Sequence, residues 1–205
     1  MIFSYSVTQL FSYSAIMKPY HIVLASNSPR RKELLRGLGI AFEVRVIPDI
    51  DESFPQDMPP SEIPCYIAHK KADAYRAAIK AGELIITADT VVVLDDRIIE
   101  KPADRDDAIR MLHLLSGRTH EVITGVVMTS LEKQAGFSAH STVDFAVLED
   151  EEIIHYVDTC RPYDKAGAYG IQEWIGYIGV QGISGSFYNV MGLPIQRLYQ
   201  ELKQF

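Results

Sequence analysis

The amino-acid sequence predicts a mixed α/β sheet flanked by helices. Apolar runs rich in β-branched residues alternate along the chain with segments of helical periodicity. Some neighbouring runs are joined by tight turns and others by a helix, so both antiparallel and parallel strand pairs are expected. The 205 residues are 47% hydrophobic and 23% charged, which is ordinary composition for a folded globular protein.

Strands are expected wherever a short apolar, β-branched run is bounded by turn-forming residues. These runs cover residues 22–25, 42–47, 84–88, 91–94, 98–99, 120–129, 139–147 and 177–183. Asp95 and Asp96 predict a hairpin turn between residues 94 and 98. The runs 120–129 and 139–147 are expected to pair as antiparallel neighbours.

Helices are expected where a start signal precedes apolar residues at helical spacing. Ser28 before Pro29 is a good N-cap followed by a good first helical residue, and Gly37 with Gly39 ends that helix. An acidic, proline-bearing loop follows over residues 48–60. Further helices are predicted over residues 61–81, 104–115, 149–157 and 193–202.

The first 17 residues differ from the rest of the chain. They contain no Lys or Arg, and polar residues interrupt every apolar stretch, so they do not have the pattern of a secretory signal. We interpret residues 1–17 as an unstructured extension or a misassigned start, with Met17 beginning the functional chain. Residues 18–205 are expected to form one domain.

Charge and cysteine content limit the classes of partner. The chain has 20 Lys and Arg against 27 Asp and Glu, a net charge of −7, so it should repel nucleic acid and anionic membranes, and any phosphate site must be local. No apolar run approaches the length of a membrane span, so a soluble protein is expected. Cys65 and Cys160 are too few for a disulfide framework and predict reduced thiols in a cytoplasmic protein.

The stretch from Ser26 to Lys32 is the first concentration of unusual polar residues. A strand-to-helix turn offers backbone N–H groups to an anion, and Arg30 and Arg31 add donors that match phosphate. Cations at a helix N-terminus oppose the macrodipole by about 0.3 to 1 kcal/mol each, which suggests a bound anion. The alternative is a solvated basic face on an exposed helix.

Carboxylates form the second group of candidates. Asp89 follows the apolar run 84–88, and ligands of α/β proteins bind outside strand ends, where an Asp can hold a divalent metal or activate water. Glu52, in a loop with Asp49 and Asp51, could bring a second carboxylate to a metal. The alternatives are a turn-forming pair of Asp89 with Thr90 and a solvated acidic loop.

Other polar residues are weaker candidates when taken alone. Lys71 and Lys101 have the default interpretation of surface lysines, and His120 at a strand start is more often structural than catalytic. The glycine-rich stretch 164–172 carries opposite charges and is expected to line a cleft, the alternative being an ordinary loop. The sequence contains no phosphate loop of the G-x-x-x-x-G-K-[ST] type, no G-x-G-x-x-G, no H-E-x-x-H and no G-x-S-x-G.

Six ordered motifs together resemble the Maf family of nucleoside triphosphate pyrophosphatases. They lie at residues 25–31, 88–92, 100–102, 115–117 with His120, 164–172 and 192–194. The resemblance runs from about Ile22 to the C-terminus and implies an elongated mixed sheet, with two lobes and a nucleotide cleft between them, as in Maf and ITPase-like proteins. It also suggests a homodimer.

The resemblance implies roles for individual residues. Asp89 would be the catalytic carboxylate, as general base or metal ligand, and Glu52 the second metal-binding carboxylate. The triphosphate would be held by Ser26, Arg30, Arg31, Lys71 and Lys101. Arg30 and Thr90, together with Gln172 at the end of the 164–172 motif, resemble the subfamily that hydrolyses dTTP and UTP.

Splitting a nucleoside triphosphate between the α and β phosphorus places negative charge on the departing pyrophosphate. This developing charge must be stabilised, which a divalent metal, Mg²⁺ or Mn²⁺, and a group of Arg and Lys side chains can do. Together with this chemistry, the resemblance implies a metal-dependent dTTP and UTP pyrophosphatase that removes non-canonical or modified pyrimidine nucleotides. The alternatives are a nucleotide-binding regulator of cell division without turnover and the 7-methyl-GTP-specific enzyme of the same family. Asp89 favours an enzyme, because a carboxylate beside a phosphate is unfavourable unless a metal intervenes.

Overall fold

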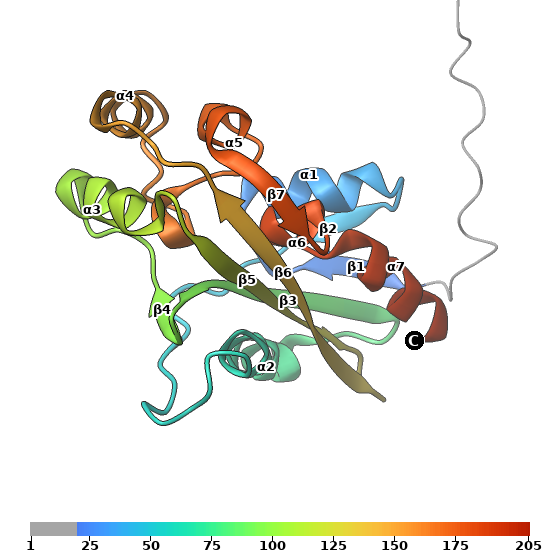
Figure 1. Ribbon diagram of the computed structural model, residues 1–205. Helices are drawn as coiled ribbons and strands as arrows, with labels where there is room; N and C mark the ends of the chain where they lie inside the picture. Colours follow the sequence, from blue (N-terminus) through green and yellow to red (C-terminus); the bar gives the residue numbers. More distant parts are fainter. Residues whose placement is uncertain (1–19) are drawn as a thin grey trace, which may run out of the picture.

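The computed structural model describes residues 20–205, in which seven strands form one mixed sheet (Figure 1). The strand order is β2-β1-β3-β5-β6-β7, with β4 paired to β3. The strands are β1 (His21–Leu24), β2 (Phe42–Val44), β3 (Glu83–Leu94), β4 (Arg97–Ile99), β5 (Thr119–Thr129), β6 (Gln134–Phe145) and β7 (Val180–Ser184). The predicted extension 1–17 lies outside the described residues, and the single domain 18–205 stays a prediction.

The sheet is parallel on one side and antiparallel on the other. β1 pairs in parallel with β2 and β3, whereas β3 with β5, β5 with β6, and β6 with β7 are antiparallel. The parallel pairs require crossovers, which α1 (Pro29–Gly37) and α2 (Ile63–Tyr75) supply. The mixed α/β sheet flanked by helices is therefore confirmed.

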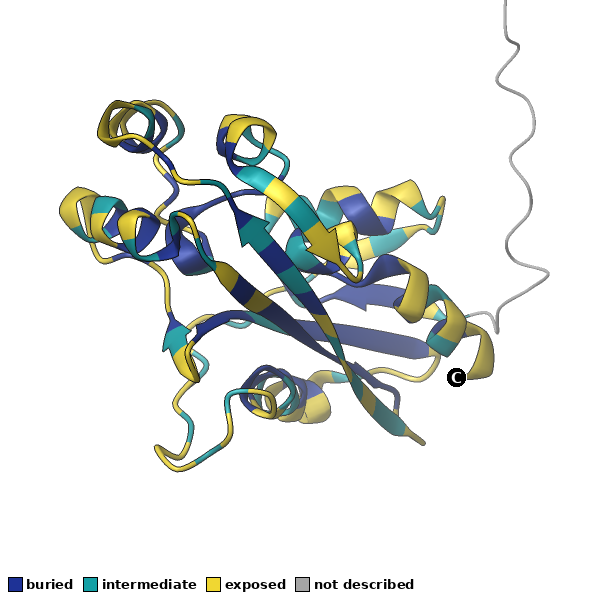
Figure 2. Ribbon diagram, viewed as in Figure 1, coloured by how far each residue is buried: buried dark blue, intermediate teal, exposed yellow. Residues whose placement is uncertain are grey.

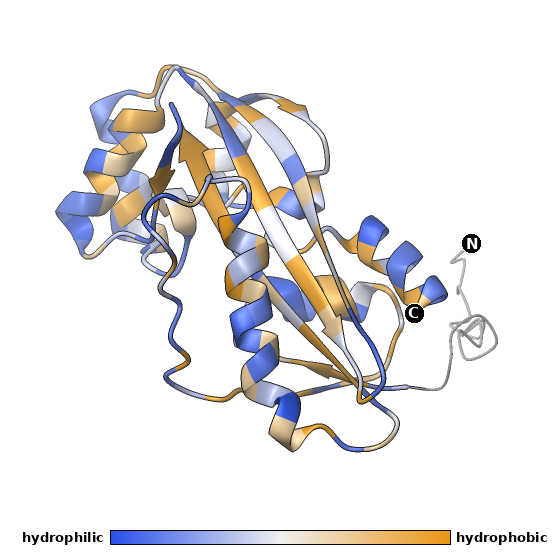
Figure 3. Cartoon of the chain, turned by 90° about the horizontal axis from the view of Figure 1, so that it is seen from below, coloured by the Kyte–Doolittle hydropathy of each residue, from blue (hydrophilic) through white to orange (hydrophobic). Residues whose placement is uncertain are grey.

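The helices cover both faces of the sheet. α2 lies along one face, where it contacts β3 and β5, and Figure 3 shows it running across the long strands. On the other face lie α1, the short α6 (Phe187–Val190) and α7 (Ile195–Gln204) (Figure 1). Beyond one end of β3 and β5 stand α3 (Arg105–Leu115), α4 (Asp150–Cys160), α5 (Trp174–Gly179) and the 3₁₀ turn η3 (Ala166–Ala168).

Strand β3 forms the centre of the hydrophobic core, and its side chains alternate between the two faces. Val91 and Val93 pack against Ile63 and Ile67 of α2, whereas the even-numbered positions of the strand face the larger cluster on the other side. Figure 2 shows the strand as almost wholly buried. Within its twelve residues, Asp89 and the neighbouring Thr90 are the two that are only partly buried.

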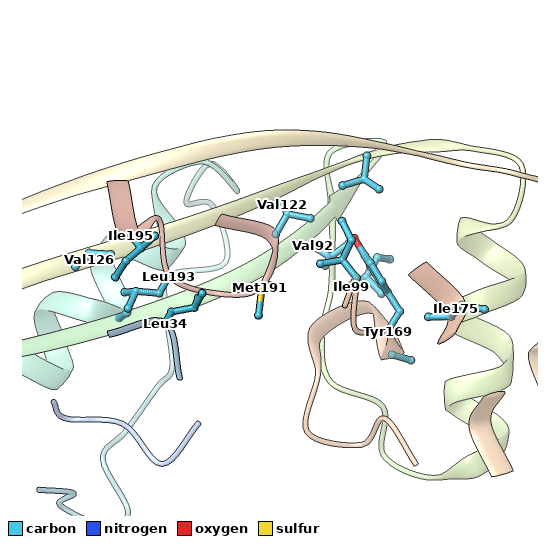
Figure 4. Close-up of a cluster of buried hydrophobic side chains, with 14 of the residues drawn as sticks. Leu34, Val92, Ile99, Val122, Val126, Tyr169, Ile175, Met191, Leu193 and Ile195 are labelled. Atoms are coloured by element: carbon cyan, nitrogen blue, oxygen red, sulfur yellow. The ribbon is translucent and has the colours of Figure 1, made fainter. Parts of the chain in front are cut away.

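The larger cluster divides into two groups of side chains. Figure 4 shows Leu34 and Leu193 in one group and Val92 and Tyr169 in the other, with Met191 between them. Val92, Tyr169 and Met191 of this one cluster also line the cleft described below, and the two lobes stay a prediction.

Several predicted elements have different limits in the structure. The runs 84–88 and 91–94 are one strand, because β5 pairs with β3 straight through this region, with Asp89 opposite Gly125 and Thr90 opposite Thr124. The helix predicted over 61–81 ends at Tyr75, followed by the 3₁₀ turn η2 (Arg76–Ala78). The Tyr75 hydroxyl donates to the Arg45 carbonyl, which fixes this side chain against the β2 loop.

Other differences concern the sheet edge. Strand β2 is shorter than the predicted run 42–47, and β6 begins earlier than the predicted run 139–147. The predicted strand 177–183 divides into the end of α5 and β7, because helix α5 continues to Gly179. Neither α6 nor η3 was expected, since segments this short carry no periodicity of their own.

No helix in residues 20–205 is long and apolar enough to cross a membrane. Cys65 and Cys160 are both free thiols, as the sequence predicts.

Gly125 allows α2 to lie close to β5. A Cβ atom there would lie 2.3 Å from the backbone nitrogen of Cys65 and 2.4 Å from the carbonyl carbon of Pro64. Backbone atoms cannot move aside as a flexible side chain can, so the whole N-terminal part of α2 would have to shift.

We predict that Gly125→Ala destabilises the fold by about 1–3 kcal/mol or more, because the added methyl group overpacks this contact. The midpoint of urea unfolding measures the effect. Gly37→Ala is the matched control, since a Cβ at Gly37 meets nothing within 4 Å. An unchanged midpoint for Gly125→Ala would show that α2 can move away from β5 without a loss of stability.

Candidate active site

A cavity of about 610 Å³ opens beside the middle of β3. Every residue predicted from the sequence to act in a site lines this cavity: Ser26, Arg30, Arg31, Glu52, Lys71, Asp89, Thr90, Lys101 and Gln172. They come from segments far apart in the chain. The structure thus brings the candidates together, while their individual roles stay predictions.

The cleft exists because one edge of β3 lacks a strand partner over part of its length. β1 pairs with residues 83–86 of β3, and β4 pairs with residues 92–94 on the same edge. Between these pairs, residues 87–91 have no strand partner on this edge in the described part of the chain, although their other edge pairs with β5. Both faces of the sheet are reachable from this gap, so Asp89 on the α2 side and Thr90 on the α1 side line one cavity.

The turn before α1 is built on serine hydroxyls. Ser28 is the N-cap of the helix, and its hydroxyl accepts from the Arg31 backbone N–H at 3.4 Å. The buried Ser26 hydroxyl accepts from the Ser28 backbone N–H at 3.2 Å. The predicted N-cap is confirmed, and these bonds fix the start of α1 at the cleft.

Arg31 ties this turn to β3 and to the loop after α6. Its guanidinium donates to the carbonyls of Ala88 (2.9 Å) and Gly192 (2.8 Å) and to the Thr90 hydroxyl (3.0 Å). Desolvation lowers the pKa of Arg31, while nearby Asp89 acts in the opposite direction. Since most of its donors are engaged with the protein, Arg31 shapes the cleft wall in addition to the phosphate contact that the sequence predicts.

Arg30 forms an ion pair across the cleft. Its Nη1 donates to Asp164 Oδ2 at 3.0 Å, and the other oxygen of Asp164 accepts from Lys165 Nζ at 2.7 Å. Burial raises the pKa of the Asp164 carboxyl, but the hydrogen bond from Lys165 and the charge of Arg30 together hold it below its usual range. The pair joins residues 134 positions apart.

Lys71 lies between the two predicted metal-binding carboxylates. Its Nζ is 2.8 Å from Asp89 Oδ1 and 3.0 Å from Glu52 Oε1. Lys71 comes from α2, Glu52 from the loop before that helix and Asp89 from β3. The two carboxylates therefore converge on one point, as metal ligands must.

Gln172 presents an unpaired acceptor to the cleft. Its Oε1 is buried and has no hydrogen-bond partner among the described residues. The flanking residues are anchored, because the Gly170 backbone N–H donates to the Tyr156 hydroxyl at 3.0 Å and that hydroxyl donates to Glu173. A buried carbonyl oxygen without a donor favours a ligand that brings an N–H group.

Lys165 is a cleft residue that was not singled out by the sequence. It is buried, and its Nζ lies 3.2 Å from Glu173 Oε1 as well as beside Asp164. The opposite charges of the 164–172 stretch were the available signal. That they pair with each other and with Arg30 depends on contacts between distant segments.

A second group of potential metal ligands lies at the far end of β3. His21, Glu43 and Glu83 lie close together there, but Arg45 donates to both oxygens of Glu83, at 2.7 and 3.0 Å. This ion pair lowers the pKa of Glu83 to about 2. Because a guanidinium already neutralises these carboxylates, we interpret the group as structural.

His120 is structural, as the sequence favours. It is buried, its Nε2 lies 2.8 Å from the Tyr169 hydroxyl, and its ring packs edge-on against Phe145 and Tyr169. Burial lowers the pKa of His120 to about 4. It does not line the cleft, whereas its partner Tyr169 does.

We predict that His120 makes the protein less stable in mild acid. The unfolded chain binds a proton at this side chain near pH 6.5, but the folded protein does so only near pH 4, so stability falls as pH falls between these values. The free energy of unfolding should fall by about 2 kcal/mol between pH 8 and pH 5 because of His120, and this contribution should be absent in His120→Gln. Urea unfolding at pH 8 and pH 5 measures it, with the exposed His140→Gln as control. Equal acid sensitivity of His120→Gln and the unmodified protein would contradict the assignment.

A mixed α/β sheet with a cleft that gathers carboxylates, arginines and lysines is typical of proteins that bind phosphorylated ligands. Residues 21–205 match the family model described as Maf-like protein, so the chain belongs to the Maf family. The resemblance seen in the sequence is confirmed.

Relatives agree with this membership, and a solved structure has a similar fold. A dTTP/UTP pyrophosphatase of Parabacteroides distasonis is 61% identical over 189 residues, covering 92% of this chain and 98% of the relative. The dTTP/UTP pyrophosphatase of Bacteroides thetaiotaomicron is 60% identical over 185 residues, covering 90% and 96%. The Staphylococcus aureus Ham1 protein has a similar fold, with a TM-score of 0.50 at 17% identity, and the similarity covers 88% of this chain and 99% of that one.

Proposed function

We propose that the protein hydrolyses dTTP and UTP to the nucleoside monophosphate and pyrophosphate with the help of Mg²⁺ or Mn²⁺. The observation that carries the proposal is the convergence of Glu52 and Asp89 in a cavity that also holds arginines, lysines and an unpaired Gln172 oxygen. The relatives named dTTP/UTP pyrophosphatase support the same activity. We expect a cytoplasmic enzyme, and a homodimer is the oligomeric state that the family suggests.

The cleft suits a nucleoside triphosphate in size and charge. Its volume of about 610 Å³ lies within the range of small-molecule sites. Five cationic residues line it, namely Arg30, Arg31, Lys71, Lys101 and Lys165. In a chain of net charge −7, gathering cations in one cleft directs polyanionic substrates there.

Glu52 and Asp89 fit a hard divalent cation. Their oxygens converge on a single point at the cleft wall, and carboxylate oxygens are the donors that Mg²⁺ and Mn²⁺ prefer. When bound, such a cation supplies neutralisation of the charge that develops on the departing pyrophosphate.

The chain's own side chains perform the remaining tasks. A water oxygen attacks the α-phosphorus, and the bond from that phosphorus to the oxygen bridging the β-phosphorus breaks. Asp89 orients this water and accepts its proton. Lys71 and Lys101 stabilise the negative charge of the leaving group, and Arg30 with Ser26 holds the phosphates in line.

We predict that Asp89→Asn lowers turnover about a hundredfold or more while the fold stays intact, because the amide keeps the shape and loses the charge. Pyrophosphate release from dTTP at saturating Mg²⁺ measures the rate, and circular dichroism reports the fold. Asp96→Asn, at an exposed turn residue, is the control and should keep the full rate. A near-normal rate for Asp89→Asn would make Asp89 a structural residue.

Base recognition follows from the unpaired oxygen of Gln172. Uracil and thymine carry one ring N–H between two carbonyls, so this oxygen can accept from the ring N–H while a donor such as Arg30 meets a carbonyl. Cytosine has no N–H at this ring position and places an amine where uracil has a carbonyl. Each unsatisfied buried group costs about 1–3 kcal/mol.

We predict that UTP and dTTP are hydrolysed well ahead of CTP and the common purine triphosphates, and that Gln172→Ala erodes this preference more than it lowers turnover. The ratio of kcat/KM for UTP over CTP is the measurement, with the exposed Gln181→Ala as matched control. Equal efficiency toward UTP and CTP, or a preference for 7-methyl-GTP, would overturn the base assignment. Tight nucleotide binding without any pyrophosphate release would instead favour a regulator.

A further inference from the structure

Lys71 holds both carboxylates of the candidate metal site at once. Its Nζ contacts Asp89 Oδ1 at 2.8 Å and Glu52 Oε1 at 3.0 Å, so a single ammonium group fills the place between them. Lys71 donates a hydrogen bond to Asp89 and forms an ion pair with Glu52, and these two carboxylates are the groups that a divalent cation would need as ligands.

The ion pair between Lys71 and Asp89 is largely shielded from water. The side chain of Lys71 is 14% exposed and that of Asp89 is 13% exposed, whereas Glu52 is 49% exposed. Separating Lys71 from Asp89 without replacement would leave a mostly desolvated carboxylate unpaired, which is strongly unfavourable. Any process that moves Lys71 must therefore bring another cation to Asp89.

The other cations of the cleft do not share this position. Arg30 is paired with Asp164, and Arg31 donates to carbonyls and hydroxyls. Lys101 is exposed and forms no ion pair within residues 20–205. Among the five cationic residues that line the cleft, Lys71 is the one that forms an ion pair with Asp89.

We propose that Lys71 is a built-in counter-ion that competes with the divalent cation for Glu52 and Asp89. The inference rests on the proposed function, because it takes these carboxylates as the metal ligands. A divalent cation and an ammonium at the same two carboxylates repel each other at close range. Metal loading therefore releases Lys71 from Asp89, and the freed ammonium becomes available to the phosphates of the substrate.

One consequence concerns the order of events. In the absence of nucleotide, Lys71 has no ion-pair partner other than Glu52 and Asp89 within residues 20–205, and it stays at these carboxylates, so metal binding is weak. A triphosphate offers Lys71 a new partner, so the metal and the nucleotide each raise the affinity of the protein for the other. Lys71 thus couples metal binding to the presence of substrate.

The test is direct binding of Mn²⁺ to the nucleotide-free protein, followed by the electron paramagnetic resonance signal of free Mn²⁺. Lys71→Met should bind Mn²⁺ at least about tenfold more tightly than the unmodified protein, because a positive charge beside the site is removed. Lys101→Met is the matched control. It removes one cation from the same cleft without touching either carboxylate and should change Mn²⁺ affinity by less than about threefold.

The thermal midpoint is a second readout, which keeps the test valid if Lys71→Met folds less stably than the unmodified protein. Removing Lys71 leaves Asp89 unpaired, so Mn²⁺ should raise the thermal midpoint of Lys71→Met by more than it raises that of the unmodified protein. Lys71→Gln, which keeps a polar side chain, should behave in the same way. Mn²⁺ affinity that is equal or weaker in both variants would overturn the inference.

Asp89→Asn distinguishes this inference from the function on which it rests. If Asp89→Asn weakens Mn²⁺ binding but Lys71→Met does not tighten it, the metal site stands and only the counter-ion role fails. If Asp89→Asn binds Mn²⁺ as the unmodified protein does, the metal ligand assignment itself fails.

Discussion

The unpaired edge of β3 is the constraint on which the site depends. A strand edge presents backbone groups that need partners, and over residues 87–91 neither β1 nor β4 supplies them. Arg31 takes over part of that task, since its guanidinium donates to the Ala88 carbonyl where a neighbouring strand would. The same side chain donates to the Gly192 carbonyl, so one residue ties the open sheet edge to the loop after α6.

The two arginines at the start of α1 are compensated within the chain. From the sequence alone, cations at this helix N-terminus suggested a bound anion. In the structure Arg30 finds the carboxylate of Asp164, and Arg31 finds the carbonyls of Ala88 and Gly192. The chain itself thus compensates both charges, and a bound anion at this helix start stays a prediction. Asp164 is a carboxylate that already occupies Arg30, and a phosphate must compete with it.

Much of the fold and the membership of the cleft could be predicted from the sequence. Motifs are local, so Ser28 as N-cap and Asp89 at a strand could be recognised without knowledge of the tertiary structure. The continuity of β3 could not, because Asp89 and Thr90 interrupt the apolar pattern and only the partner strand β5 shows that pairing continues. Likewise, the burial of Lys165 depends on contacts that a linear pattern does not contain.

The side chains predicted to bind the phosphates and the one predicted to bind the base differ in whether they already have polar partners before a ligand binds. Arg30 and Lys71 already have carboxylate partners, so phosphate contacts exchange one partner for another and yield a modest net gain. The buried oxygen of Gln172 has no hydrogen-bond partner among residues 20–205, so a base that donates to it removes the free-energy cost of leaving this acceptor unpaired. A base without that N–H leaves the penalty in place. Discrimination between bases should therefore be steeper than discrimination between phosphate chains of similar charge.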